Sequence, residues 1–215
     1  MNDYPSLAVK VWGELACFTR PEMKAERVSY PVMTPSAARG LLEAIFWKPE
    51  FFWKVREIQV LKEIRYFSLV RNEVNKKANA DNAQSWATKG EGFYCAEDDR
   101  AQRHTLALRD VCYIIKADVV LKEGIREDPA KYRDQFRRRV DKGQCFHRPY
   151  LGCREFAAKF SNPAGDEKPL ALDMDLGRML FDLVFEKNKT GRGKPRFFQA
   201  KLKSGVLNVP PELYA

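Results

Sequence analysis

Side chains that can transfer protons near neutral pH are scarce in this sequence. His104 and His147 are the only histidines among 215 residues, and an isolated histidine is often structural rather than catalytic. The five cysteines contain no C-x-x-C pair, so with two histidines they do not match a zinc-site pattern. Motifs of the G-x-S-x-G, Walker and H-E-x-x-H types are also missing. The sequence therefore predicts neither a metal nor a cofactor.

The overall charge favours a polyanionic partner. Lysine and arginine total 38 against 29 acids, which gives a net charge of +9 and an isoelectric point near 9.3. Such a balance favours nucleic acid ahead of a membrane surface, although a basic protein without either partner is the alternative. An apolar fraction of 45% with 14 phenylalanines supports a packed core and excludes the disordered class.

The densest basic cluster lies in residues 131–142, where six positive side chains accompany two acids. They are Lys131, Arg133, Arg137, Arg138, Arg139 and Lys142, against Asp134 and Asp141. Arginine and lysine neutralise phosphates and release counterions, so this cluster predicts a surface that follows a nucleic-acid backbone. A solvated helix face without a partner is the alternative.

A second basic stretch, residues 187–203, is interleaved with glycine and aromatic residues. It contains Lys187, Lys189, Arg192, Lys194, Arg196, Lys201 and Lys203, together with Gly191, Gly193, Phe197 and Phe198. Basic loops beside exposed aromatics suit single-stranded or looped RNA, whose bases can stack. Alternatively, the two phenylalanines alternate between core and surface in a strand. Any cleavage would have to be metal-free, which RNA allows because its 2′-hydroxyl can attack the neighbouring phosphate.

Hydrophobic periodicity predicts the elements that must position these groups. Strands are expected at 7–12, 55–67, 111–121 and 149–160, and helices at 35–46 and 129–142. Thr34-Pro35 and Asp128-Pro129 provide the two helix starts, while Lys48-Pro49 ends the first helix. Residues 72–99 are predicted to be a long mobile or functional loop. The order β-α-β-β-α-β predicts an α+β fold with a ferredoxin-like arrangement.

Three further strands are predicted after this unit, at 178–185, 196–203 and 206–209. They indicate a small antiparallel sheet appended to the first domain, so we expect domains at 1–160 and 161–215. The start of the chain does not resemble a signal peptide, and no window of eighteen apolar residues is present. A reduced, cytoplasmic protein without membrane contact is expected.

Four segments closely resemble a known family. They are ACFTRPEMKAERVSYPVMTPSAARGLLEAIFWKP (16–49), FSLVRNEV (67–74), LRDVCYIIKADV (108–119) and PYLGCREF (149–156). They resemble the CRISPR-associated Cas-five-d family of subtype I-C, or Dvulg subtype, within the RAMP superfamily. The likeness extends from residue 7 to about 209, and several long motifs occur in the right order.

The resemblance implies a ferredoxin-like domain with an appended β-domain. It also implies a metal-independent endoribonuclease that cuts precursor CRISPR RNA at the base of the repeat hairpin, leaving a 2′,3′-cyclic phosphate and a 5′-hydroxyl. The protein would then hold the 5′ handle as a subunit of the type I-C interference complex, and would be a monomer when isolated. A non-catalytic subunit that binds the guide's 5′ handle, and a sequence-independent duplex-DNA binder, are the alternatives.

The family's catalytic set is a tyrosine at the end of the first helix plus an adjacent lysine and histidine at the start of the second. These positions fall on Phe46, Lys131 and Tyr132, so only the lysine is preserved. Lys131 could lower the pKa of Tyr132, or His147 could approach the same site from its loop. Residues expected to contact RNA are Lys24, Arg27, Trp47, Lys48, Arg133, Arg137, Lys189, Arg192 and Lys194, with Trp47 either a stacking platform or a core residue.

Overall fold

The computed structural model describes residues 4–23, 25–76, 79–184 and 193–214. Its strands are β1 (Leu7–Ala16), β2 (Arg27–Val28), β3 (Phe51–Val60), β4 (Tyr66–Val74), β5 (Arg100–Leu121), β6 (Lys159–Ser161), β7 (Met174–Val184), β8 (Lys194–Lys203) and β9 (Val206–Asn208). Its helices are α1 (Pro35–Ile45), α2 (Ala80–Lys89) and α3 (Pro129–Asp141), with 3₁₀ turns at Glu97–Asp99 and Pro211–Tyr214. The result is a mixed α/β architecture around a curled, mostly antiparallel sheet.

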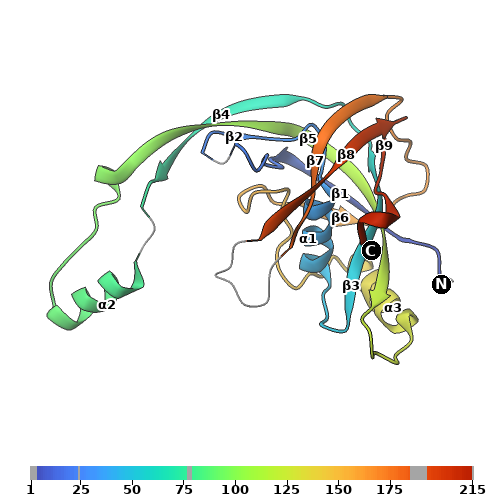
Figure 1. The fold of residues 1–215 in the computed structure, drawn as a ribbon, viewed down its shortest axis with the longest axis horizontal. Helices are drawn as coiled ribbons and strands as arrows, with labels where there is room; N and C mark the ends of the chain where they lie inside the picture. Colours follow the sequence, from blue (N-terminus) through green and yellow to red (C-terminus); the bar gives the residue numbers. More distant parts are fainter. Residues whose placement is uncertain (1–3, 24, 77–78, 185–192, 215) are drawn as a thin grey trace.

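The long strand β5 organises the sheet. The path through the sheet is β6-β1-β5-β3-β9-β8-β7, and β2 and β4 also pair with β5. Ile115 lies opposite Val9 of β1 and Ile58 of β3, and all three side chains are fully buried. The predicted strands at 7–12 and 111–121 are therefore confirmed, within elements that extend further. In Figure 1, α1 and α3 lie on the same side of this sheet.

The two predicted long helices are present, and their ends follow local chemistry. The Thr34 hydroxyl accepts a hydrogen bond from the Ala37 amide and the Asp128 carboxylate accepts one from Ala130, so each caps its helix. In α3, Tyr132, Phe136 and Val140 face the core, as their spacing predicted.

The predicted loop at 72–99 is wrong. Strand β4 continues to Val74, α2 fills residues 80–89, and β5 begins at Arg100. Figure 1 shows β4 and β5 as a long hairpin that leaves the body and carries α2 at its far end. This hairpin has few buried side chains, so it lacks the apolar alternation by which a strand is recognised in sequence. The single stretch expected at 55–67 is likewise divided between β3 and β4.

The strand predicted at 149–160 is also wrong over most of its length. Only Lys159–Ser161 pairs with β1, while residues 149–157 form a compact turn in which the Leu151 amide binds the Phe156 carbonyl. Gly152 has a φ of +86°, and a Cβ there would come within 2.0 Å of the Cys17 carbonyl oxygen. The turn therefore packs directly against the end of β1 and requires glycine at this point.

The three C-terminal strands lie close to their predicted positions. Strand β9 pairs with β3 as well as β8, so within the described residues these strands continue the same sheet. The division at 160/161 stays a prediction. No described helix is long and apolar enough to cross a membrane.

Candidate functional site

The start of α3 holds the two adjacent family positions in different environments. Lys131 is exposed and its ammonium lies 2.8 Å from the Glu127 carboxylate. Tyr132 is only 2% exposed, and its hydroxyl donates a hydrogen bond to the same carboxylate. That hydrogen bond, with burial, raises the pKa of Tyr132 to about 12. The expectation that Lys131 lowers this pKa is therefore wrong, because Glu127 stands between the two groups.

The third family position is part of the core. Phe46 is 1% exposed, and its ring centroid lies 5.6 Å from that of Phe51. Phe51 in turn lies 5.2 Å from the Tyr132 ring. The structure thus brings Phe46 and Tyr132 together through a shared aromatic neighbour. Neither ring offers a group that ionises near neutral pH.

The basic cluster on α3 is largely engaged within the protein. Arg133 is 1% exposed and donates to the Pro5 carbonyl, so its expected position on an exposed phosphate-binding face is wrong. Burial lowers the pKa of this guanidinium. Arg139 donates to the Ile45 carbonyl at the end of α1, and Arg137 lies 3.0 Å from Asp134. Arg138 and Lys142, which are four positions apart, are exposed.

Other expected RNA contacts are scattered over the molecule. Arg27 links Glu73 and Glu155 at 3.1 and 3.5 Å, so it joins the β4–β5 hairpin to the turn at 149–157. Lys194 is exposed on β8. The remaining three, Lys24, Lys189 and Arg192, lie outside the described residues.

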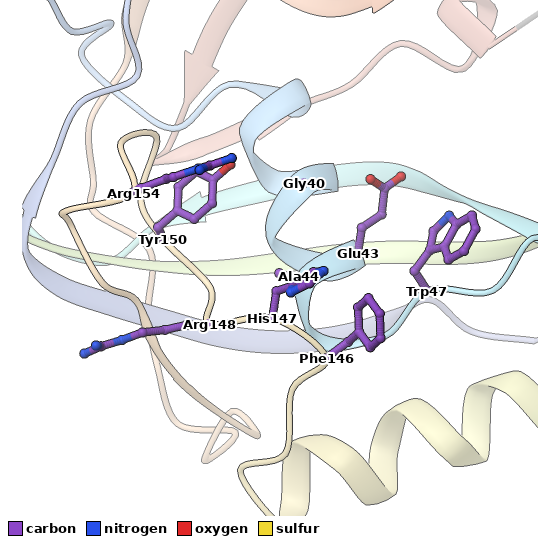
Figure 2. A pocket seen from close by; sticks show the side chains of 9 residues that line it. All are labelled: Gly40, Glu43, Ala44, Trp47, Phe146, His147, Arg148, Tyr150 and Arg154. Carbon is purple, nitrogen blue, oxygen red and sulfur yellow. The ribbon is translucent and has the colours of Figure 1, made fainter. Parts of the chain in front are cut away.

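A surface hollow of about 760 Å³ lies at the C-terminal end of α1, and we call it the α1-end hollow. It is lined by Gly40, Glu43, Ala44, Trp47, Phe146, His147, Arg148, Tyr150 and Arg154. Figure 2 shows the Trp47 and Phe146 rings near one another at one end, Tyr150 and Arg154 at the other, and His147 between them. Trp47 and His147 were expected at a functional site. The other polar and aromatic lining residues were not.

Main-chain hydrogen bonds fix the histidine-bearing loop on α1. The amides of Phe146 and His147 both donate to the Ala44 carbonyl, at 2.8 and 3.0 Å. They satisfy an acceptor that the helix end leaves without an intrahelical partner. The loop is therefore held at the helix end that carries Phe46, one of the family positions.

The α1-end hollow carries cations that are free of acids. Within the described residues, no ion pair or side-chain hydrogen bond engages Arg148 or Arg154, which line the hollow, and none engages Lys48, which follows Trp47 in the chain. The acid that lines the hollow, Glu43, is bound 2.7 Å from Arg39. A phosphate entering here would meet positive side chains without first displacing a carboxylate.

Over residues 4–23, 25–76, 79–184 and 193–214, no group of three or more histidine, cysteine or acidic side chains is placed to hold a metal ion.

The fold is mixed α/β, and its α1-end hollow combines arginine side chains with aromatic rings, which is a combination that nucleic-acid-binding surfaces use. Residues 6–210 match the family model of the CRISPR-associated protein (Cas_Cas5), in its Cas5d form. The chain therefore belongs to the Cas5d family of CRISPR-associated proteins, and the resemblance drawn from the sequence motifs is confirmed.

Two curated relatives cover nearly the whole chain. The CRISPR pre-crRNA endoribonuclease Cas5d of Thermus thermophilus is 49% identical over 97% of this chain and 93% of its own length. The protein of the same name from Mannheimia succiniciproducens is 45% identical over 95% of each. A crystal structure of a CRISPR-associated protein superposes with a TM-score of 0.69 at 23% identity, covering 97% of this chain and 93% of that one, which supports the fold.

Proposed function

We propose that this protein is an endoribonuclease that cuts precursor CRISPR RNA at the base of a repeat hairpin. It then keeps the 5′ handle as a subunit of a type I-C interference complex. Support comes from the family, from the names of two relatives at 45–49% identity, and from the net charge of +9. The α1-end hollow supplies a surface on which such an RNA can bind.

The fold that we propose for the first part of the chain is a ferredoxin-like unit. The order β1-α1-β3-β5-α3-β6 along the chain, and β6-β1-β5-β3 across the sheet, agree with a β-α-β-β-α-β unit whose two helices share one side. In this arrangement the end of α1 and the loop after α3 come from the two halves of the unit. The α1-end hollow lies where they meet.

The proposed reaction uses the RNA's own nucleophile. A base removes the 2′-hydroxyl proton, the resulting oxygen bonds to the adjacent phosphorus, and the bond from phosphorus to the 5′-oxygen breaks. A proton returned to that oxygen leaves a 5′-hydroxyl and a 2′,3′-cyclic phosphate. The protein must supply only proton transfer and a cation for the charge on the phosphate oxygens.

His147 is proposed as the proton-transfer group. Imidazole is the side chain best suited to taking and giving protons near neutral pH, and here it lies exposed in a hollow with unpaired arginines. This placement is the observation that carries the proposal. Lys131 is proposed as a cation that leaves its surface pair with Glu127 for the phosphate, since such pairs are worth about 0–1 kcal/mol. Tyr132 positions Glu127, and Phe46 packs the core.

Incubation of the purified protein with repeat RNA in EDTA tests the proposal. A discrete cut at the hairpin base, with a 2′,3′-cyclic phosphate on the upstream product, is expected. Loss of cleavage in EDTA that returns with magnesium or manganese would overturn the mechanism.

A second candidate function is a non-catalytic subunit that holds the guide's 5′ handle. It is favoured by the hydroxyl missing at Phe46 and by the raised pKa of Tyr132. In the same assay, tight and specific binding of the repeat without any cut would support this function.

A further inference from the structure

Two large aromatic rings stand exposed at one end of the α1-end hollow. The side chain of Trp47 is 48% exposed and that of Phe146 is 64% exposed. Figure 2 shows both rings on the same side of the cavity. The interpretation of Trp47 as a core residue is therefore wrong. Two large rings exposed to water lose the free energy that their burial would contribute. Their exposure near one another therefore favours a ligand-binding role.

Hydrogen bonds hold the backbone next to both rings. On one side, the Phe46 amide bonds to the Leu42 carbonyl and the Phe46 carbonyl accepts from the indole of Trp53. On the other, the Phe146 amide bonds to Ala44. Both rings are thus carried on the same helix end, so little backbone entropy would be lost when a ligand binds between or upon them.

The rings are available for stacking. Among the described residues, no aromatic ring or cation packs against Trp47, while Phe146 contacts His147 edge-on at 4.3 Å. A nucleobase is a flat ring that can stack on either face. Its phosphates would meet Lys48 next to Trp47 and the arginines along the hollow. This combination of open aromatic faces and unpaired cations fits single-stranded RNA better than a neutral apolar partner.

We propose that Trp47 and Phe146 form a stacking site for one unpaired nucleobase of the repeat RNA, next to the hairpin. The inference rests on the proposed function in that it takes repeat RNA as the ligand. It adds that the protein holds an unpaired nucleotide, and that the α1-end hollow is the place where this nucleotide binds. An unpaired base is required, because a base inside the hairpin stem is already stacked on its neighbours. Stacking would anchor the strand so that the following phosphate lies near His147.

The test is a set of repeat RNAs, each with one unpaired nucleotide made abasic, and with 2′-deoxyribose at the nucleotides flanking the hairpin base to prevent cutting. Dissociation constants are measured for the parent protein and for Trp47→Ala, Phe146→Ala and Phe93→Ala. The last is a matched control, because Phe93 is 83% exposed but lies between α2 and β5.

With intact RNA, Trp47→Ala should weaken binding about 5- to 150-fold, which corresponds to about 1–3 kcal/mol for one stacked base. At one nucleotide position, removal of the base should weaken RNA binding by the parent by a similar factor, and RNA binding by Trp47→Ala by almost nothing. Phe93→Ala keeps both rings of the site, so removal of that base should weaken its binding by the same factor as it weakens binding by the parent. If, at every nucleotide position, the loss of affinity from base removal and the loss from Trp47→Ala multiply as independent effects, the proposal is overturned.

Two further variants separate stacking from folding. Trp47→Phe keeps an aromatic face and should stay within about threefold of the parent, whereas Trp47→Leu should bind like Trp47→Ala at an unchanged melting temperature. Equal binding by the phenylalanine and leucine variants would contradict stacking. Because the RNA cannot be cut, the result is independent of cleavage: position-specific loss in a protein that fails the EDTA assay would leave this site standing without the endoribonuclease.

Discussion

The basic residues of α3 and those of the α1-end hollow differ in what their charges do. On α3, Arg133 is buried, Arg139 holds the end of α1, and Lys131 and Arg137 are paired with acids. In the hollow, Arg148 and Arg154 are exposed without an acidic partner in the described chain. The cluster that is denser in sequence is therefore the one whose charges are mostly engaged by other groups of the protein.

This difference teaches that a run of basic residues is not by itself a binding surface. In α3, four of the thirteen residues are buried and one of these is Arg133, so a helix with many arginines buries or pairs some of them. The irregular turn at 149–157 has no such periodicity, and its backbone turns Tyr150 and Arg154 to the same hollow. Function is accordingly expected on the hollow side.

The largest effect is expected from His147. His147→Ala should reduce single-turnover cleavage of repeat RNA by about 10²- to 10⁴-fold, because it removes the proton-transfer group. Binding should change little. His104→Ala, the matched control on β5, should cut at the parent rate. Equal activity of both variants would move the chemistry away from the α1-end hollow.

A smaller loss is expected at the start of α3. Lys131→Ala should slow cleavage about tenfold, or about 1.4 kcal/mol in transition-state stabilisation, while hairpin affinity falls much less. The reason is that its ammonium would separate from Glu127 mainly in the transition state, when negative charge develops on the phosphate, and less when the RNA only binds. Single-turnover rates with parallel binding measurements check this. A parent-like rate would leave α3 without any part in the reaction.

The smallest effect concerns Tyr132. Its pKa of about 12 means that the phenol stays protonated far above neutral pH, so it cannot act as a base there. Tyr132→Phe should therefore leave the shape of the rate profile between pH 5 and 9 unchanged and alter the rate about threefold or less. A limb of the profile that disappears in this variant would show that the phenol takes part in proton transfer.

Much of the fold was predictable because burial follows local periodicity. Alternation in β1 and β5, and the spacing of Tyr132, Phe136 and Val140 in α3, all report contact with one core. The β4–β5 hairpin was not predictable in this way. It is held mainly by backbone pairing in solvent, which leaves little trace in side-chain type.

The candidate site was predictable only in part. Proline rules placed Trp47 and Lys48 at a helix end, and His147 was considered because histidine is rare in the chain. Arg148 and Arg154 were missed, since nothing in a one-dimensional sequence distinguishes an unpaired arginine from one that is paired or buried. Arg133 shows the opposite error: it was expected to contact RNA, but its guanidinium points inward and donates to the Pro5 carbonyl.

The salt dependence of repeat-RNA affinity tests most directly whether the α1-end hollow, rather than α3, meets the phosphates. Two variants each remove two positive charges: Arg148→Ala with Arg154→Ala, and Lys131→Ala with Arg137→Ala. The first should flatten the slope of log affinity against log salt by up to about 1.4, at about 0.7 per lost single-strand contact, and the second by less than half of that. Equal flattening, or greater flattening by the α3 variant, would contradict this account.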